Sequence, residues 1–155
     1  MNSNPTSFEE LLADLSRYGV DYILVGGLAV ALCGFIRATL DVDILVQADQ
    51  ENIRRLLQRL VHVGEGHARE LTPDDFTLEE GSIRIVEEFP VDVFMLMSGH
   101  TYEDLLPLTA RHRIDDVEIV YLNAEGLIAL KADSLRPQDQ IDVQALRDIL
   151  RHKDC

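Results

Sequence analysis

Residues 22–46 read YILVGGLAVALCGFIRATLDVDILV, and two glycines divide the first half of this stretch into two apolar runs. The first run, Tyr22–Val25, is short and β-prone, which is typical of a buried strand. The second run, residues 28–33, is rich in alanine and leucine and favours a helix. The stretch therefore predicts a strand, a turn at Gly26 and Gly27, and a helix in immediate succession.

From residue 36 to residue 46 apolar side chains occupy every second position, and polar side chains stand between them as far as Asp43. This alternation predicts a strand with one face toward the core. Asp41 and Asp43 share the other face with Cα atoms about 7 Å apart, so their carboxylates can converge on one cation. Two such charges repel unless a cation or water separates them, so the pair by itself fits either a metal site or a solvated pair of acids.

A third acid, Asp92, lies in the apolar run PVDVFML of residues 90–96, where an unpaired charge would be costly. If this run forms a strand beside the first one, three carboxylates face one point. Such a set provides the hard oxygen ligands that two Mg²⁺ ions need in phosphoryl or nucleotidyl transfer. Backbone N–H groups at Gly26 and Gly27 would face the phosphates. Arg37 and Thr39 lie on the same strand face as the acids and could reach phosphate oxygens or hold the acids in place.

The rest of the chain alternates between helical and strand patterns, without an internal repeat or a linker rich in Pro, Gly or Ser. Strand patterns cover residues 82–86, 91–96 and 117–122, the first two as a pair. Residues 64–80 give no clear pattern. We therefore expect one α+β (mixed α/β) domain over residues 1–155, with a mixed sheet flanked by helices. Periodicity and capping residues predict these helices over residues 7–19, 50–61 with Asp49 as the cap, 101–106, 123–133 and 137–152.

Composition limits the classes of function. The chain has 155 residues, 14 Lys and Arg against 28 Asp and Glu, and a formal net charge of -14. This balance excludes a protein that binds DNA nonspecifically through a basic surface, whereas a nucleotide accompanied by Mg²⁺ suits an acidic pocket. Cys33 and Cys155 lack disulfide or zinc spacing, and the longest uncharged run, residues 22–36, is too short to span a membrane. We therefore expect a cytoplasmic protein with Cys33 in the core.

The glycine pair, the following helix and the Asp-Val-Asp segment together resemble the DNA polymerase β-like nucleotidyltransferase superfamily. The segment RATLDVD, residues 37–43, is similar to the Arg-x-Ser/Thr-x-Asp-apolar-Asp motif of AbiEii-type toxin nucleotidyltransferases and of minimal nucleotidyltransferases. The resemblance implies the nucleotidyltransferase fold and metal ligation by Asp41, Asp43 and Asp92. The segment KADSLRPQDQID, residues 131–142, also resembles a helical segment of this family, with Gln138 in place of the usual Lys.

Lys131 opens that second segment and has two interpretations. As part of the nucleotide site it would contact a phosphate, and as a residue in the last turn of a helix it would be a solvated charge favoured by the helix dipole. Asp139 and Asp142 likewise are either site residues or acids that stabilise the start of a helix. Arg111, His112 and Arg113 form a small basic patch.

These observations predict a Mg²⁺-dependent nucleotidyltransferase with two ions, or Mn²⁺ in their place. It would transfer NMP from an NTP such as ATP to a hydroxyl group and release pyrophosphate. The acceptor stays open between a protein partner, as in toxin–antitoxin pairs, a tRNA 3′ end and a small molecule. A helical partner protein or a homodimer could select it. The alternative is a non-catalytic module of the same fold that binds a nucleotide or a partner, which is favoured if Asp92 points away from Asp41 and Asp43.

Overall fold

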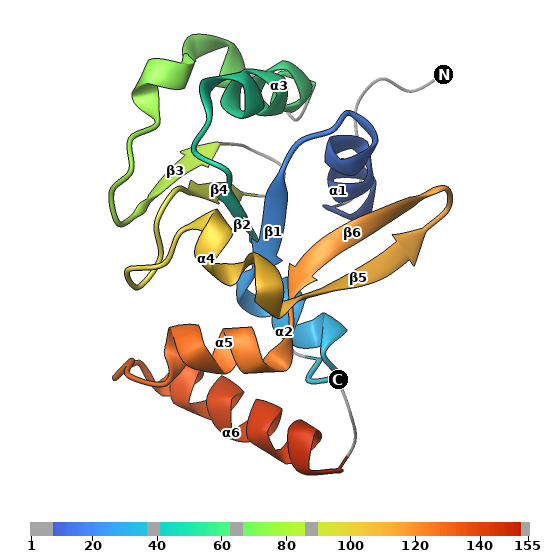
Figure 1. The fold of residues 1–155 in the computed structure, drawn as a ribbon, viewed down its shortest axis with the longest axis vertical. Helices are drawn as coiled ribbons and strands as arrows, with labels where there is room; N and C mark the ends of the chain where they lie inside the picture. Colours follow the sequence, from blue (N-terminus) through green and yellow to red (C-terminus); the bar gives the residue numbers. More distant parts are fainter. Residues whose placement is uncertain (1–7, 37–40, 63–66, 86–89, 153–155) are drawn as a thin grey trace.

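The structure is a computed structural model that describes residues 8–36, 41–62, 67–85 and 90–152. Over these residues it forms a six-stranded sheet with helices around it (Figure 1). The strands are β1 (Tyr22–Val25), β2 (Val42–Val46), β3 (Ser82–Ile85), β4 (Val91–Phe94), β5 (Thr109–Ile114) and β6 (Val117–Leu122). The helices are α1 (Phe8–Arg17), α2 (Gly26–Leu32), α3 (Gln50–Leu60), α4 (Tyr102–Leu105), α5 (Ala124–Lys131) and α6 (Pro137–His152), with 3₁₀ turns η1 (His67–Glu70), η2 (Pro73–Asp75) and η3 (Leu106–Leu108).

The sheet is mixed, with the strand order β3-β4-β2-β1-β6-β5. Strand β1 runs antiparallel to β2 and parallel to β6, and β2 runs parallel to β4. The outer pairs β3–β4 and β5–β6 are antiparallel. Strand β1 is buried along its whole length, and β2 is buried except at Asp43. The expected mixed sheet of an α+β protein is therefore confirmed, and its polar interruptions lie in the central strands.

The helices pack through their buried apolar side chains. Helix α1 packs against β6 and α3, helix α2 contacts β1 and β2, and α5 packs against α6. Figure 1 shows the α5–α6 pair lying beyond the end of the sheet at which β1 and β6 finish. Fully buried leucines such as Leu15 and Leu56 hold α1 and α3 on the core, each contributing about 2 kcal/mol of transfer free energy. None of the described helices is both long enough and apolar enough to cross a membrane.

The strand expected over residues 36–46 is shorter in the structure. Ile36 is 83% exposed and belongs to no strand, residues 37–40 lie outside the described residues, and β2 begins only at Val42. Asp41 thus directly precedes β2. The glycine pair also differs from the expectation, because Gly26 and Gly27 are the first two residues of α2. A positive φ of 75° at Gly26 lets the chain pass from β1 into the helix without an intervening turn.

Strand β5 was not predicted from the sequence. Its residues, TARHRI, lack an apolar alternation because β5 is an edge strand whose Arg111, His112 and Arg113 are exposed. Pairing with β6 in register from Thr109 to Ile114 forms the strand instead. The expected basic patch therefore lies on an edge strand. A smaller difference concerns a cap, since Asp49 occupies the N-cap position of α3 without a side-chain cap bond. Ser7, the expected cap of the first helix, lies outside the described residues.

Candidate functional site

One row of residues crosses four strands and contains three charged side chains. Val25 of β1 pairs with Asp43 of β2, and Asp43 pairs with Asp92 of the parallel strand β4. Asp92 in turn lies opposite Arg84 of β3. Because residues in register on neighbouring strands point to the same face, Asp43, Asp92 and Arg84 share one side of the sheet.

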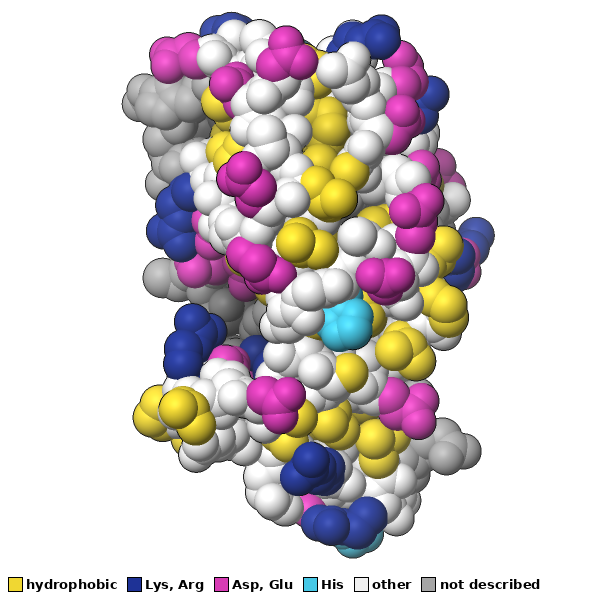
Figure 2. Space-filling view, turned by 60° about the vertical axis from the view of Figure 1, so that its left-hand side comes forward, with side chains coloured by type: hydrophobic (Ala, Val, Ile, Leu, Met, Phe, Trp, Pro, Cys, Tyr) yellow, Lys and Arg dark blue, Asp and Glu magenta, His cyan; other side chains and the backbone are white. Residues whose placement is uncertain are grey.

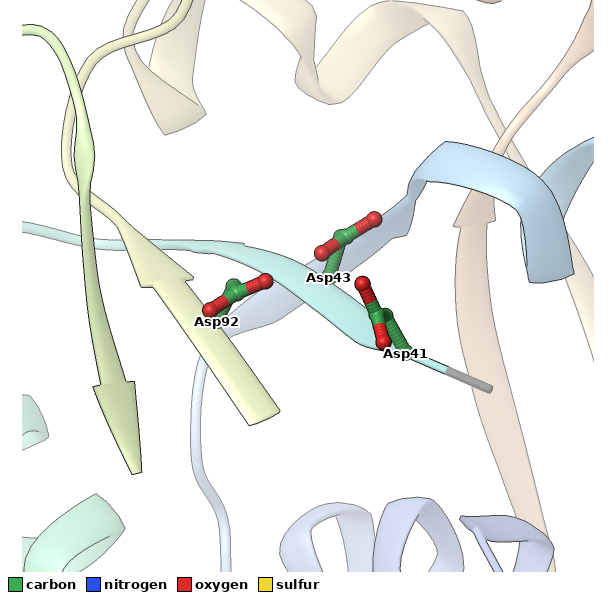
Figure 3. Close-up of side chains that lie close together, drawn as sticks. All are labelled: Asp41, Asp43 and Asp92. Carbon is green, nitrogen blue, oxygen red and sulfur yellow. The ribbon is translucent and has the colours of Figure 1, made fainter. Parts of the chain in front are cut away.

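Asp41, Asp43 and Asp92 form an acidic group on that side. Each carboxylate offers one oxygen, and these three oxygens lie within 4.8 Å of one another. Figure 3 shows the carboxyl groups turned toward a common space, with Asp41 and Asp43 from the β2 segment and Asp92 from β4. The side chain of Asp92 is 9% exposed and that of Asp41 is 42% exposed, so the group reaches from the protein interior to its surface.

Burial and mutual repulsion change the acidity of Asp43. The pKa of Asp43 is raised to about 7, mainly by desolvation. The charge and hydrogen bond of Asp92 and the charge of Asp41 add to this increase, and the charge of Lys131 opposes it. Burial and the neighbouring carboxylates thus favour the protonated form of Asp43 up to neutral pH. Converging hard oxygen ligands of this kind fit a divalent cation, which would relieve the repulsion.

Gly26 is required beside this acidic group. A β-carbon built on Gly26 would lie 2.2 Å from Oδ2 of Asp43, far inside van der Waals contact. The backbone at the start of α2 therefore contacts the Asp43 carboxylate directly, which any larger residue would prevent. The positive φ at Gly26 adds a second requirement for glycine at this position.

Arg84 is a site residue that the sequence reasoning missed. Its Nε donates to Oδ1 of Asp92 at 2.9 Å and its Nη2 donates to Oδ2 at 3.0 Å, which is a two-pronged contact. The same Nη2 also donates to Oδ2 of Asp41 at 3.3 Å. In the sequence Arg84 stands between Ile83 and Ile85, a pattern that equally fits an exposed strand face. Only the pairing of β3 with β4 would have revealed its position opposite Asp92.

A cavity of about 540 Å³ opens beside the acids, between the sheet and the α5–α6 pair. This volume is typical of small-molecule sites. Its wall has a polar part at Gly26 and the acids and an apolar part formed by side chains of β4, the following turn and α5. The lining residues are Gly26, Gly27, Asp41, Asp43, Phe94, Met97, Ser98, Leu127, Leu130, Lys131, Ser134, Arg136, Gln138 and Asp139.

Lys131 is not the solvated charge that one interpretation expected. Its side chain is 13% exposed, and its Nζ lies 2.8 Å from Oδ1 of Asp139 and 3.4 Å from Oδ2 of Asp142. Burial alone would raise the pKa of Asp139, but hydrogen bonds from Lys131 and Ser134 and the nearby positive charges hold it below its ordinary value. Asp142 also accepts a hydrogen bond from Gln138 at 2.9 Å. The two helix acids therefore hold Lys131 at the cavity wall.

Of the residues expected to form the site, most are brought together. One cavity is lined by five of them, namely Gly26, Gly27, Asp41, Asp43 and Lys131. Asp92 does not line the cavity but belongs to the acidic group with Asp41 and Asp43. The remaining two candidates, Arg37 and Thr39, lie outside the described residues. The expectation that Cys33 is a core residue is confirmed, since it is 3% exposed.

Comparison with solved structures supports the fold. The chain is similar to the lincosamide antibiotic adenylyltransferase LnuA in its lincomycin-bound form, with 16% identity, a TM-score of 0.60, and 96% of this chain and 99% of that chain covered. It is also similar to a Thermotoga maritima protein whose assignment as a nucleotidyltransferase is provisional, with 16% identity, a TM-score of 0.52, and coverage of 94% and 91%. At this identity both similarities concern the fold alone.

Comparison with sequences identifies the family. No curated protein is similar enough in sequence to match this chain. The model of one family, described as "Nucleotidyltransferase of unknown function (DUF6036)", matches residues 6–151, which is nearly the whole chain. The mixed sheet and the acidic group beside a cavity agree with that description, and the protein is therefore a nucleotidyltransferase of the DUF6036 family.

Proposed function

We propose that the protein transfers NMP from an NTP to a hydroxyl group of an acceptor, with Mg²⁺ or Mn²⁺ bound by Asp41, Asp43 and Asp92. The observation that carries this proposal is the convergence of three carboxylates from β2 and β4 beside a cavity of substrate size. The non-catalytic alternative would be favoured if Asp92 faced away from the other two acids. Asp92 faces them instead, which favours the enzyme.

Each acid has a proposed task that follows from its position. Bound divalent cations would neutralise the triphosphate and lower the pKa of the attacking hydroxyl. Asp41 and Asp43, which line the cavity, would hold the cations on the triphosphate side. Asp92, more deeply buried, would complete the ligand set on the acceptor side. The acceptor oxygen then attacks the α-phosphorus, and the bond to the β-phosphate breaks with release of pyrophosphate.

The NTP has a proposed orientation within the cavity. Backbone at Gly26 and Gly27 borders the acids and would approach the phosphates, and Lys131 would lie on the opposite side of them. Because Asp139 and Asp142 already hold Lys131, its ammonium would be fixed in place before the nucleotide binds. Arg37 and Thr39 remain proposed phosphate contacts. The apolar wall of the cavity, formed by Phe94, Met97, Leu127 and Leu130, would cover the nucleobase.

For the acceptor we favour a protein partner, as in a toxin–antitoxin pair, or a small molecule over a tRNA 3′ end. Figure 2 shows acidic side chains spread over one face of the molecule, with the basic side chains of the described residues mostly along the edges of this view. Together with the net charge of -14, this distribution gives little electrostatic attraction for RNA. A helical partner protein or a second copy of the chain could complete the acceptor site.

The proposal is tested by calorimetric titration with ATP, GTP, CTP and UTP, each with and without Mg²⁺. We expect one NTP to bind in a Mg²⁺-dependent way and binding to be lost in the variant Asp41→Asn/Asp43→Asn. Asp115→Asn is the matched control, because Asp115 lies in the turn between β5 and β6 and its positive φ of 52° is readily adopted by Asn. NTP binding that does not depend on Mg²⁺, or NTP binding of unchanged affinity in the double variant, would contradict the proposal.

A further inference from the structure

We infer that Arg84 is a positioning residue of the acidic group, which orients the Asp92 carboxylate for cation binding. The inference rests on the proposed cation site but assigns a task to a residue outside the segments whose sequences resemble the superfamily. Its basis is the contact between Arg84 and the acids, which joins β3 to the two acid-bearing strands β2 and β4.

The contact fixes the orientation of the Asp92 side chain. Two parallel hydrogen bonds, Nε to Oδ1 at 2.9 Å and Nη2 to Oδ2 at 3.0 Å, define the plane of the carboxylate as well as its distance. The backbone register supports this geometry, since Arg84 and Asp92 are cross-strand partners. The Asp92 carboxylate is therefore held from its β3 side, and it faces Asp43 on its other side.

The second contact of Arg84 connects it with the rest of the group. Its Nη2 also donates to Oδ2 of Asp41 at 3.3 Å, so a single guanidinium bridges two of the three acids. One positive charge beside three carboxylates lowers their mutual repulsion and keeps their oxygens within 4.8 Å of one another. We expect the acids to separate when this bridge is removed.

The arrangement requires arginine rather than any cation. The planar guanidinium presents two N–H groups in the fork that matches a carboxylate, whereas the ammonium of lysine is a single point charge. The Arg84 side chain is 58% exposed while that of Asp92 is 9% exposed. The arginine thus extends from the surface to a buried ligand, as residues that orient metal ligands in proteins do.

The experiment measures binding of Mn²⁺ alone, by electron paramagnetic resonance of the free ion and by calorimetry. It compares the wild type with Arg84→Met, Arg84→Lys and the control Arg113→Met, which alters an exposed arginine on β5, the opposite edge strand. We expect both Arg84 variants to bind Mn²⁺ about tenfold or more weakly, since residues that orient metal ligands typically contribute 10-fold to 100-fold to affinity. The control should bind like the wild type.

Three results would overturn the inference. Tighter or unchanged Mn²⁺ binding in Arg84→Met would make Arg84 a competing charge or a structural residue, and full binding in Arg84→Lys would make its geometry unimportant. Equal binding by the wild type and Asp43→Asn would reject the cation site itself, and the inference with it. Circular dichroism of every variant verifies folding. If Arg84→Met does not fold, the comparison of Arg84→Lys, which retains the charge, with the wild type decides the result.

Discussion

Gly26 lies so close to Asp43 that a β-carbon on it would stand 2.2 Å from the carboxylate Oδ2. The backbone at the start of α2 therefore packs directly against the Asp43 side chain of β2, with no room for a β-carbon between them. This relationship and the positive φ of Gly26 explain why glycine is needed at the first position of α2.

Gly26→Ala should destabilise the protein and displace the Asp43 carboxylate. The positive φ of 75° costs about 1–2 kcal/mol for alanine, and the clash with Asp43 adds to that cost. Gly19→Ala is the matched control, because Gly19 has a φ of 77° but a β-carbon added to it would meet nothing within 4 Å. We expect Gly19→Ala to lose about 1 kcal/mol in urea unfolding and to retain Mn²⁺ affinity, whereas Gly26→Ala loses both. Equal Mn²⁺ affinity in the two variants would contradict this account.

Asp43→Asn should stabilise the cation-free protein at neutral pH. The pKa of Asp43 is about 7 in the folded protein and near 3.8 in the unfolded chain, so the folded state binds the extra proton between these values. Stability therefore falls as pH rises from about 4 to about 7, and the loss is complete above pH 7. In thermal unfolding with EDTA, the midpoint of Asp43→Asn should exceed that of the wild type by a few degrees at pH 8 and match it near pH 4.

The same shift predicts how cation binding depends on pH. A cation must displace the proton that Asp43 holds, so Mn²⁺ affinity of the wild type should increase as pH rises and level off above pH 7. Calorimetry in two buffers of different ionisation enthalpy measures the proton released on binding. An affinity that does not change between pH 5.5 and pH 7.5 would show that Asp43 is not a ligand.

Lys131→Met should be strongly destabilising. It leaves Asp139 and the fully buried Asp142 without the ammonium group that contacts both, and breaking a buried ion pair on one side typically costs about 3–5 kcal/mol. Lys131→Met/Asp142→Asn should recover part of this free energy of unfolding, because the more deeply buried of the two carboxylate charges is then removed. If Lys131→Met unfolds at the same urea concentration as the wild type, the network contributes nothing to stability.

The apolar wall of the cavity can be tested separately from the phosphate site. Leu130→Ala should weaken binding of the preferred NTP about threefold to tenfold and leave binding of inorganic tripolyphosphate with Mg²⁺ unchanged, since only the nucleoside contacts this wall. Leu135→Ala is the control, because Leu135 is 87% exposed and does not line the cavity. An equal loss for the NTP and tripolyphosphate would place the phosphates, not the base, at Leu130.

The sequence was most informative where one strand or helix carries the whole signal. The periodicity of α1 and α3 predicted these helices, because burial of one face imposes a repeat on the residues. The apolar run of β1, which is buried along its whole length, and the isolated Asp92 were also visible within a single segment. Residues whose position depends on strand pairing could not be found in this way. Arg84 acts only through its register with Asp92, and β5 is formed by pairing with β6 without an apolar pattern of its own.

The positions of the acids were likewise predictable from the sequence only in part. Spacing predicted that Asp41 and Asp43 share a face, although Asp41 precedes β2. That Asp43 stands in register with Asp92 depends on β2 and β4 being parallel neighbours, which no local pattern encodes. The binding of Lys131 by Asp139 and Asp142 likewise depends on the packing of α5 against α6.

The central claim, that the three acids bind a divalent cation for nucleotide transfer, is tested most directly by anomalous diffraction. Crystals would be grown with Mn²⁺ and a non-hydrolysable analogue of the preferred NTP, and data collected at the manganese edge. The account predicts anomalous density about 2.2 Å from carboxylate oxygens of Asp41, Asp43 and Asp92, with the triphosphate beside it. A bound nucleotide with its manganese elsewhere, or with none near these acids, would contradict it.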